Sequence, residues 1–187
     1  MHENDRSRRR GRRVLAFLAG LITAIASVVT PASASPTTLV LSAMDRCLQG
    51  FTPNVDVTID HPGNVPSVGY PNVADQPNVL YPGDVFDISS DGSVRIDFWG
   101  ASFGPAGKSG DFAGAGYPFP GYPKYSSIIR FNNNPSGWVG SPDLTVYYKG
   151  CHQWTSPYPV RLGFIVNDDN VGDNGGYWHY RIRHYRA

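Results

Sequence analysis

Apolar and polar residues alternate with a period of two over much of the chain after Tyr81, which is the pattern of half-buried β-strands. The alternation is clearest near the end, where Trp178, Tyr180 and Ile182 share one face of the predicted strand and the residues between them share the other. A Ser-Asp-Gly sequence at 90–92 predicts a hairpin turn between the first two strands. The predicted strands cover residues 84–88, 94–99, 127–131, 144–148, 161–166 and 177–184.

Short strands separated by turn residues predict an all-β fold, an antiparallel β-sandwich. No segment of ten or more residues after Ala34 has helical periodicity without an interrupting Gly or Pro. Residues 35–76 are less regular, because apolar runs at 38–41 and 55–59 precede a stretch rich in Pro, Gly and Asn. We expect an N-terminal segment at 35–76, either packed as short strands or draped over the sandwich, and a sandwich body at 77–187.

The N-terminus has the three parts of a secretory signal peptide. Residues 1–13 are basic, residues 14–30 form an apolar run, and Ala32-Ser33-Ala34 is a small-residue cleavage site. An uncleaved membrane anchor is the alternative, since the run is long enough to approach a membrane span. The small residues favour cleavage, so we expect a signal peptide at 1–34 and a soluble, secreted, extracellular protein with no membrane attachment after cleavage.

The composition changes once the signal peptide is removed. All 13 acidic residues after Ala34 are Asp, and this part of the chain has only three Lys, with a formal charge of −3. Glu and Lys are the usual solvent-facing residues of helices, whereas Asp, Asn, Gly and Pro favour turns. The composition therefore excludes a helix bundle or coiled coil, and without a basic stripe it argues against nucleic-acid binding.

The two cysteines, Cys47 and Cys151, are expected in an oxidising compartment if the chain is exported. One bridge is then the only possible pairing within the chain, and it would tie the N-terminal segment to the sandwich body. Two free thiols are the alternative. No CxxC motif or Cys/His cluster indicates a zinc or redox site.

The sequence has few signs of catalysis. It lacks HExxH, a P-loop and a dinucleotide-binding fingerprint. His179 and His184 are five residues apart on one predicted strand, so they face opposite sides of it and do not chelate together. A glycosidase needs two facing carboxylates, and thirteen Asp residues permit such a pair without indicating one. We expect a protein that is not an enzyme.

Residues 167–176, with the sequence NDDNVGDNGG, concentrate oxygen-bearing side chains between the last two predicted strands. Ca²⁺ takes about six to eight oxygen ligands in irregular geometry, and a tight glycine-containing loop can add main-chain carbonyls. The spacing is not that of an EF-hand, and no Glu closes the loop. An ordinary Asx-rich turn is the alternative. Crowding of Asp168, Asp169 and Asp173 without a cation would be repulsive, which favours the ion.

Two stretches of the chain carry a resemblance to a known family. The first contains YPGDVFDI at 81–88, GASFGP at 100–105 and GD at 110–111; the second contains IVND at 165–168 and GDNGG at 172–176, followed by the alternating aromatic strand. Together they resemble the bacterial PA-I-type galactophilic lectins, which are small calcium-dependent β-sandwich proteins. The resemblance covers residues 77–182 and implies a jelly-roll sandwich with a galactose-binding-domain-like fold.

The resemblance also implies a ligand set. The family's ion is held by a carbonyl before Gly-Pro and by groups of the late loop, which here correspond to the Phe103 carbonyl, the Asp168, Asp173 and Asn174 side chains and a main-chain oxygen near Val171. The ion in such lectins binds two sugar hydroxyls, so Asp168, Asp173 and Asn174 would contact both Ca²⁺ and carbohydrate. The loop is about two residues shorter here, and the family's pocket-closing His and Gln after Gly-Asp have no match.

Aromatic side chains add candidates for stacking against sugar rings, although packing in the core or in turns is the alternative for each. The candidates in loops are Tyr117, Phe119, Tyr122, Trp138 and Trp154, and the first three, in the Gly- and Pro-rich stretch 112–123, are the best candidates for an exposed rim. We therefore expect a secreted calcium-dependent carbohydrate-binding protein, with a galactose-like sugar as a possible ligand. The alternative is a structural or protein-interaction β-sandwich that holds calcium only for stability.

Overall fold

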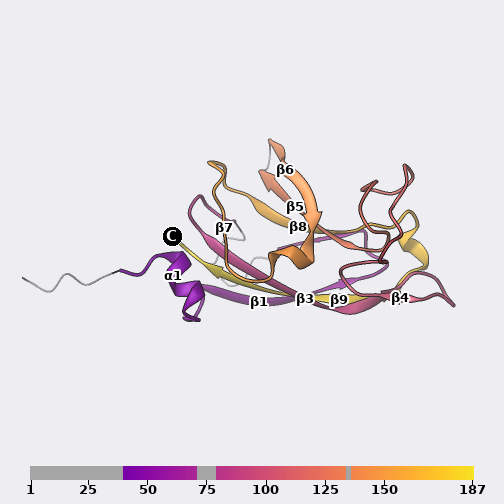
Figure 1. Ribbon diagram of the computed structural model, residues 1–187, viewed down its shortest axis with the longest axis horizontal. Helices are drawn as coiled ribbons and strands as arrows, with labels where there is room; N and C mark the ends of the chain where they lie inside the picture. The colour runs from indigo at the N-terminus through magenta and orange to yellow at the C-terminus, as the bar shows by residue number, and fades with distance from the viewer. Residues whose placement is uncertain (1–39, 71–78, 134–135) are drawn as a thin grey trace, which may run out of the picture. The chain divides into compact units, whose positions relative to one another are not determined.

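The computed structural model describes residues 40–70, 79–133 and 136–187, and the fold consists of two antiparallel sheets (Figure 1). The expected signal peptide at 1–34 and the expected boundary at 76/77 lie outside the described residues. Residues 39–187 form one unit. Within its described part, no helix has the length and apolar character needed to cross a membrane.

The first sheet is built around the longest strands of the described chain. Its order is β1 (Val55–Pro62), β9 (Gly175–Tyr185), β3 (Val85–Arg95) and β4 (Ser102–Phe103), and β7 (His152–Gln153) pairs with the start of β3. β9 is central, since it pairs with β1 on one side and with all eleven residues of β3 on the other.

The second sheet has the order β2 (Ser67–Gly69), β8 (Arg161–Val166), β5 (Ser127–Asn133) and β6 (Gly137–Leu144). Figure 1 shows β5, β6 and β8 in one layer and β1, β3 and β9 in the other. Three short helical elements complete the described chain: α1 (Ala43–Leu48) and the 3₁₀ helices η1 (Thr145–Tyr148) and η2 (Val171–Asp173). The predicted antiparallel β-sandwich is confirmed.

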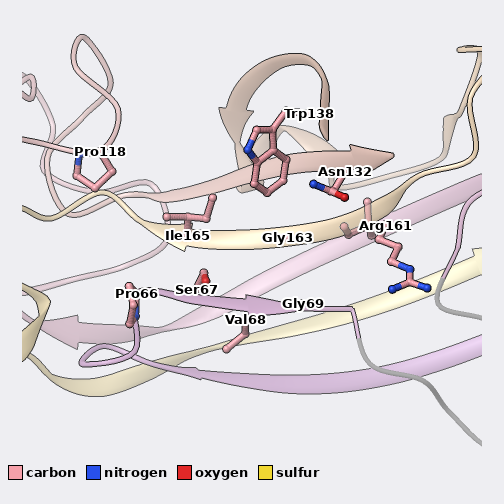
Figure 2. A pocket seen from close by; sticks show the side chains of 11 residues that line it. Pro66, Ser67, Val68, Gly69, Pro118, Asn132, Trp138, Arg161, Gly163 and Ile165 are labelled. Carbon is pink, nitrogen blue, oxygen red and sulfur yellow. The ribbon is translucent and has the colours of Figure 1, made fainter. Parts of the chain in front are cut away.

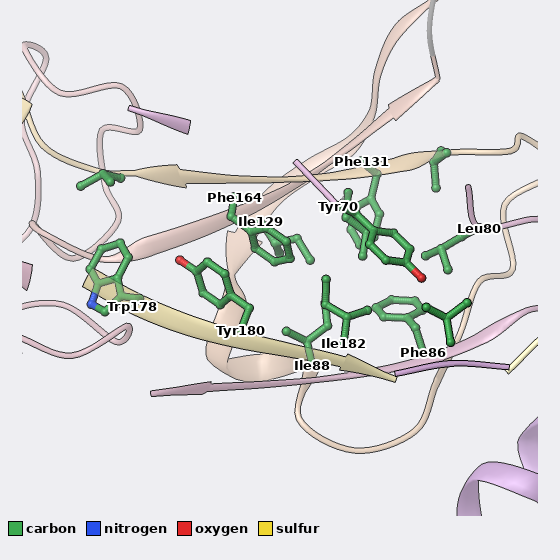
Figure 3. Close-up of a cluster of buried hydrophobic side chains, with 14 of the residues drawn as sticks. Tyr70, Leu80, Phe86, Ile88, Ile129, Phe131, Phe164, Trp178, Tyr180 and Ile182 are labelled. Atoms are coloured by element: carbon green, nitrogen blue, oxygen red, sulfur yellow. The ribbon is translucent and has the colours of Figure 1, made fainter. Parts of the chain in front are cut away.

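The core lies between the two sheets (Figure 3). Trp178, Tyr180 and Ile182 of β9 are fully buried, as the alternation predicts, and the Tyr180 ring stacks on Phe164 of β8 at a centroid distance of 4.3 Å. The Tyr180 hydroxyl also forms a 2.6 Å hydrogen bond with the Ser127 hydroxyl of β5. Apolar burial and a buried polar contact therefore both join the sheets at Tyr180.

The helix α1 is joined covalently to the rest of the unit. Ser42 and Asp45 form a capping box at its start, with the Ser42 hydroxyl accepting from the Asp45 amide at 3.1 Å. Cys47 in this helix forms a disulfide with Cys151, with their Cα atoms 6.0 Å apart. The predicted disulfide is confirmed. Cys47 packs in a small cluster with Val85 and Tyr185, so the bridge holds α1 against β3 and β9.

The predicted hairpin at Ser90-Asp91-Gly92 is wrong, because β3 continues through these residues. Gly92 has a φ of +83°, as in a turn, yet it pairs with Trp178 of β9. A Cβ at Gly92 would lie 2.6 Å from the Tyr177 carbonyl oxygen. The turn-like residues therefore form an irregularity within the strand, and the long ladder with β9 keeps the chain extended.

The predicted strand at 144–148 is also wrong beyond its first residue. β6 ends at Leu144, and residues 145–148 form η1. Residues of this helix contact the interior without forming a strand. The Thr145 hydroxyl forms a 2.8 Å hydrogen bond with the Ser127 hydroxyl, and the Tyr148 ring stacks on Phe86.

The segment 35–76, which we expected to pack as short strands or drape over the sandwich, contributes α1, β1 and β2 in its described part. β1 belongs to the first sheet and β2 to the second, whereas α1 lies outside both sheets.

Candidate functional site

The Asp- and Asn-rich loop between β8 and β9 contains two buried polar side chains in direct contact. Asp168 and Asn174 are only 6% and 8% exposed, respectively. The Asn174 Nδ2 donates to Asp168 Oδ2 at 2.7 Å and to the Gly63 carbonyl oxygen at 3.2 Å. The end of β8, the start of β9 and the turn after β1 thus meet at this pair.

The other end of the Asn174 amide has no partner. Its Oδ1 is buried and accepts no hydrogen bond from any described residue. Rotating the amide by half a turn would place Oδ1 against two acceptors, the Asp168 carboxylate and the Gly63 carbonyl, so the orientation with Nδ2 toward them is the favourable one. A buried, unpaired amide oxygen costs free energy unless a donor or a cation approaches it.

The Asp168 carboxylate has no cationic side chain as a partner among the described residues. Burial raises the pKa of its carboxyl above the ordinary value, and neighbouring Asp169 adds to the rise, although hydrogen bonds from the Asn170 amide and Asn174 partly oppose it. A buried carboxylate without a cationic partner is costly, and a bound cation would relieve that cost.

The remaining predicted calcium ligands have other partners. The Phe103 carbonyl accepts from Trp178 Nε1 at 3.1 Å, and the Val171 carbonyl accepts from the Asn174 amide at 3.3 Å. Each carbonyl keeps a second lone pair. Asp173 is exposed, and its carboxylate accepts a hydrogen bond from the side chain of Asn170, the residue before η2, at 2.7 Å.

The donor chemistry nevertheless suits a hard cation. Asp168 and Asn174 together present a carboxylate and a free amide oxygen, which are calcium ligand types. Across residues 40–70, 79–133 and 136–187, no three His, Cys, Asp or Glu side chains gather as a metal cluster. An ion at this loop would therefore depend on amide and main-chain oxygens beside Asp168.

Tyr117 and Tyr122, two of the predicted sugar-stacking residues, have different surroundings. Burial raises the pKa of the Tyr117 hydroxyl, and its bond to the Tyr125 hydroxyl and the nearby Asp169 and Asp168 carboxylates raise it further. Because the Tyr125 amide donates to the Asn167 carbonyl at 2.8 Å, Tyr117 contacts a residue bonded to the start of the Asp- and Asn-rich loop at 167–174, here called the acidic loop. Tyr122 donates its hydroxyl to the Pro142 carbonyl of β6, so the polar end of this side chain is used within the protein.

Asn167 has a role that the sequence did not distinguish from those of its acidic neighbours. It is fully buried, its Oδ1 accepts from the Phe119 amide at 3.0 Å, and its Nδ2 donates to the carbonyls of Phe119 and Pro123, each at 3.1 Å. Asn167 therefore holds the Gly- and Pro-rich stretch 112–123, here called the aromatic loop, against the end of β8. The only signal in the sequence was its position directly after a buried strand.

One of the solved structures similar to this chain is described as "EclA N-terminal domain; PllA-like lectin". It is 16% identical, with a TM-score of 0.38, and the match covers 68% of this chain and 94% of that chain. No protein-family profile matches the sequence, and no curated protein matches it. The functional argument therefore rests on the Asp168 and Asn174 geometry.

Proposed function

We propose that this chain is a secreted, calcium-dependent carbohydrate-binding protein of lectin type and not an enzyme. The single observation that carries the proposal is the buried contact between Asp168 and Asn174, in which a carboxylate lacks a described cationic partner and the amide Oδ1 lacks any described partner. The resemblance of residues 77–182 to calcium-dependent galactophilic lectins supports the same residues as ligands.

In this proposal, Asp168 and the Asn174 Oδ1 hold the ion, with the free lone pairs of the Phe103 and Val171 carbonyls as further ligands. Asp173 joins the site by exchanging its hydrogen bond to Asn170 for the ion, which its exposure permits. A bound Ca²⁺ would neutralise the buried carboxylate and offer open coordination positions to sugar hydroxyls.

The same residues would also contact the sugar. Asp168 and Asp173 carry acceptors and Asn174 carries both donors and an acceptor for hydroxyl groups. Tyr117 lies near the acidic loop and supplies an aromatic surface for the apolar side of a sugar ring. Tyr122 would contribute its ring alone, because its hydroxyl bonds to Pro142.

Calcium binding is the first experiment. We expect the native chain to bind Ca²⁺ in calorimetric titration and to melt at a higher temperature with Ca²⁺ than with EDTA, because a ligand that binds only the folded state stabilises it. Asp168→Asn should abolish this calcium-dependent rise. Asp169→Asn is the matched control, since Asp169 is an exposed carboxylate in the same loop and should leave the rise nearly intact.

Carbohydrate binding is the second experiment, on a glycan array with Ca²⁺ and with EDTA. Sugar binding that disappears with EDTA and in Asp168→Asn supports the lectin. Calcium-dependent stabilisation without any glycan signal would favour the structural sandwich instead. Equal melting temperatures of the native chain with Ca²⁺ and EDTA would refute the ion site.

A further inference from the structure

The outer face of the second sheet carries a groove that is separate from the acidic loop (Figure 2). Its volume is about 550 Å³, and its lining comes from β2, β8, β5 and β6, with Pro118 of the aromatic loop. Figure 2 shows Trp138 standing over the sheet, with Arg161 toward one end of the groove and Pro118 toward the other.

Two glycines form the floor of the groove. Gly69 of β2 pairs directly with Gly163 of β8, so neither neighbouring strand places a side chain on the outer face there. Neither glycine has a positive φ, so backbone conformation does not require glycine at these positions. A Cβ at Gly69 would approach nothing closer than 3.7 Å. Glycine in a strand often marks a surface that another molecule approaches closely, and here it leaves a flat strip of backbone.

Trp138 forms an aromatic wall beside this strip. It pairs with Asn132 of β5, and its side chain is 50% exposed although it packs against the sheet. A Cβ at Gly163 would contact the Trp138 Cη2 at 3.6 Å, so the ring borders the glycine strip directly. An exposed indole beside a flat, side-chain-free strip is suited to stacking against the apolar side of a sugar ring.

Arg161 lines the groove and gives it a positive charge, and Arg130 lies against the Trp138 ring without lining the groove. Arg161 is exposed and pairs with Asn132 across the β8–β5 ladder. The Arg130 guanidinium lies 4.5 Å from the Trp138 ring centroid, and its Nε is buried and has no partner among the described residues. Neither arginine forms an ion pair within the described chain, whereas Arg181 pairs with Asp56 at 2.6 Å on the other sheet. The groove thus has in Arg161 a cationic group that no described residue neutralises.

We propose that this groove binds an anionic oligosaccharide independently of calcium. A sugar ring lies over the Gly69–Gly163 strip and stacks on Trp138, and its carboxylate or sulfate accepts hydrogen bonds from the Arg161 guanidinium group. A peptide fits the floor less well, since the backbone groups of Gly69 and Gly163 face each other within the ladder and the floor has no pockets for side chains. The site goes beyond the proposed lectin function, because its residues are distinct from Asp168, Asn174 and the rest of that ligand set.

The test is a calorimetric titration of the full protein in EDTA with three probes. Trigalacturonate carries carboxylates, a κ-carrageenan oligosaccharide carries sulfates, and galactotriose is neutral. We expect one or both anionic probes to bind, with the better one identifying the acid group, and galactotriose to bind at least about tenfold more weakly. Affinity should fall as salt rises.

Three variants test the assignment of residues. Trp138→Ala removes the aromatic wall, Arg161→Gln removes a charge, and Gly69→Leu fills the strip at a position with open space. Each should weaken binding of the anionic probe by about tenfold or more while leaving the melting temperature close to native. Trp99→Ala is the matched control, because Trp99 is 91% exposed and lies outside this groove. Its affinity should stay native.

Several outcomes would overturn the proposal. These are the absence of binding by both anionic probes, equal affinity for galactotriose, or native affinity in both Trp138→Ala and Gly69→Leu. Tighter binding of a poly-aspartate peptide than of either anionic sugar would assign the groove to acidic peptides instead. Binding that appears only when the titration is repeated with Ca²⁺ in place of EDTA would assign the sugar to the loop around Asp168. A failed calcium experiment would leave a positive result unaffected, since the titrations that support the proposal are made in EDTA.

Discussion

Removing the Cys47–Cys151 disulfide should destabilise the protein chiefly through the unfolded state. The cysteines are 104 residues apart, so the bridge closes a loop of roughly that length. In the chain-entropy treatment, closing a loop of about 100 residues stabilises the folded state by about 4.7 kcal/mol at 25 °C. We therefore expect the double variant Cys47→Ala, Cys151→Ala to lose up to this free energy of unfolding, which is a large part of the stability of a typical domain.

The measurement is urea unfolding followed by tryptophan fluorescence, with Trp178 as a buried probe. The variant should have a lower midpoint and a larger dependence on urea, because an uncrosslinked chain exposes more surface when it unfolds. Ser42→Ala is the control, since it removes the helix cap of α1 and should cost only about 1 kcal/mol. A loss below about 1 kcal/mol in the double variant would refute the loop-closure reasoning.

Two further perturbations test the buried polar contacts. Tyr180→Phe removes the hydroxyl that joins the sheets through Ser127 and should cost roughly 1–3 kcal/mol in urea unfolding, whereas unchanged stability would show that the contact has no net value. For Asp84, burial raises the pKa, but hydrogen bonds from His184 and two main-chain amides outweigh it, so the folded pKa is lowered from 3.8. This carboxylate therefore stabilises the fold fully above pH 3.8, and the contribution is lost as the pH falls through the lower folded pKa. Acid melting curves of Asp84→Asn should have a flatter pH dependence than the native chain, and identical slopes would contradict this assignment.

Much of the fold follows from residue pattern. The alternation at 177–184 predicts β9 and its buried face because the side chains of a strand point to opposite sides of the sheet, and Trp178, Tyr180 and Ile182 are indeed fully buried. The cysteine arithmetic also identified the disulfide, since two cysteines allow one pairing within the chain. Both inferences use information contained in a short stretch or in a count.

The errors arise where the outcome depends on the strand opposite. Ser90-Asp91-Gly92 has residues typical of a turn, but pairing with the eleven-residue strand β9 keeps β3 extended. A prediction from neighbouring residues alone cannot include a strand so distant in the sequence. The groove likewise depends on register, because Gly69 and Gly163 are unremarkable until the ladder places them side by side.

At the candidate ion site, composition identified the loop but did not separate the roles of Asn167 and Asn174. The Asn167 side chain forms hydrogen bonds with the aromatic loop through both its oxygen and its nitrogen. The Asn174 Oδ1 accepts no hydrogen bond from any described residue. Which of two neighbouring amides is satisfied depends on segments far away in the chain, such as the turn at Gly63.

The central position of β9 has a consequence for the order of folding. Val55 in β1 pairs with His184 in β9, and β1 has no ladder with β3, so the first sheet lacks its middle until residues 175–185 have been synthesised. Pairing over such sequence separations is slow, because the loop must be closed before its contacts form. Both cysteines precede β9 in the chain, so the bridge can close while β1 and β3 still have open edges. An early bridge would shorten the search that β9 must make, and a nascent chain that remains reduced would expose those edges to aggregation for longer.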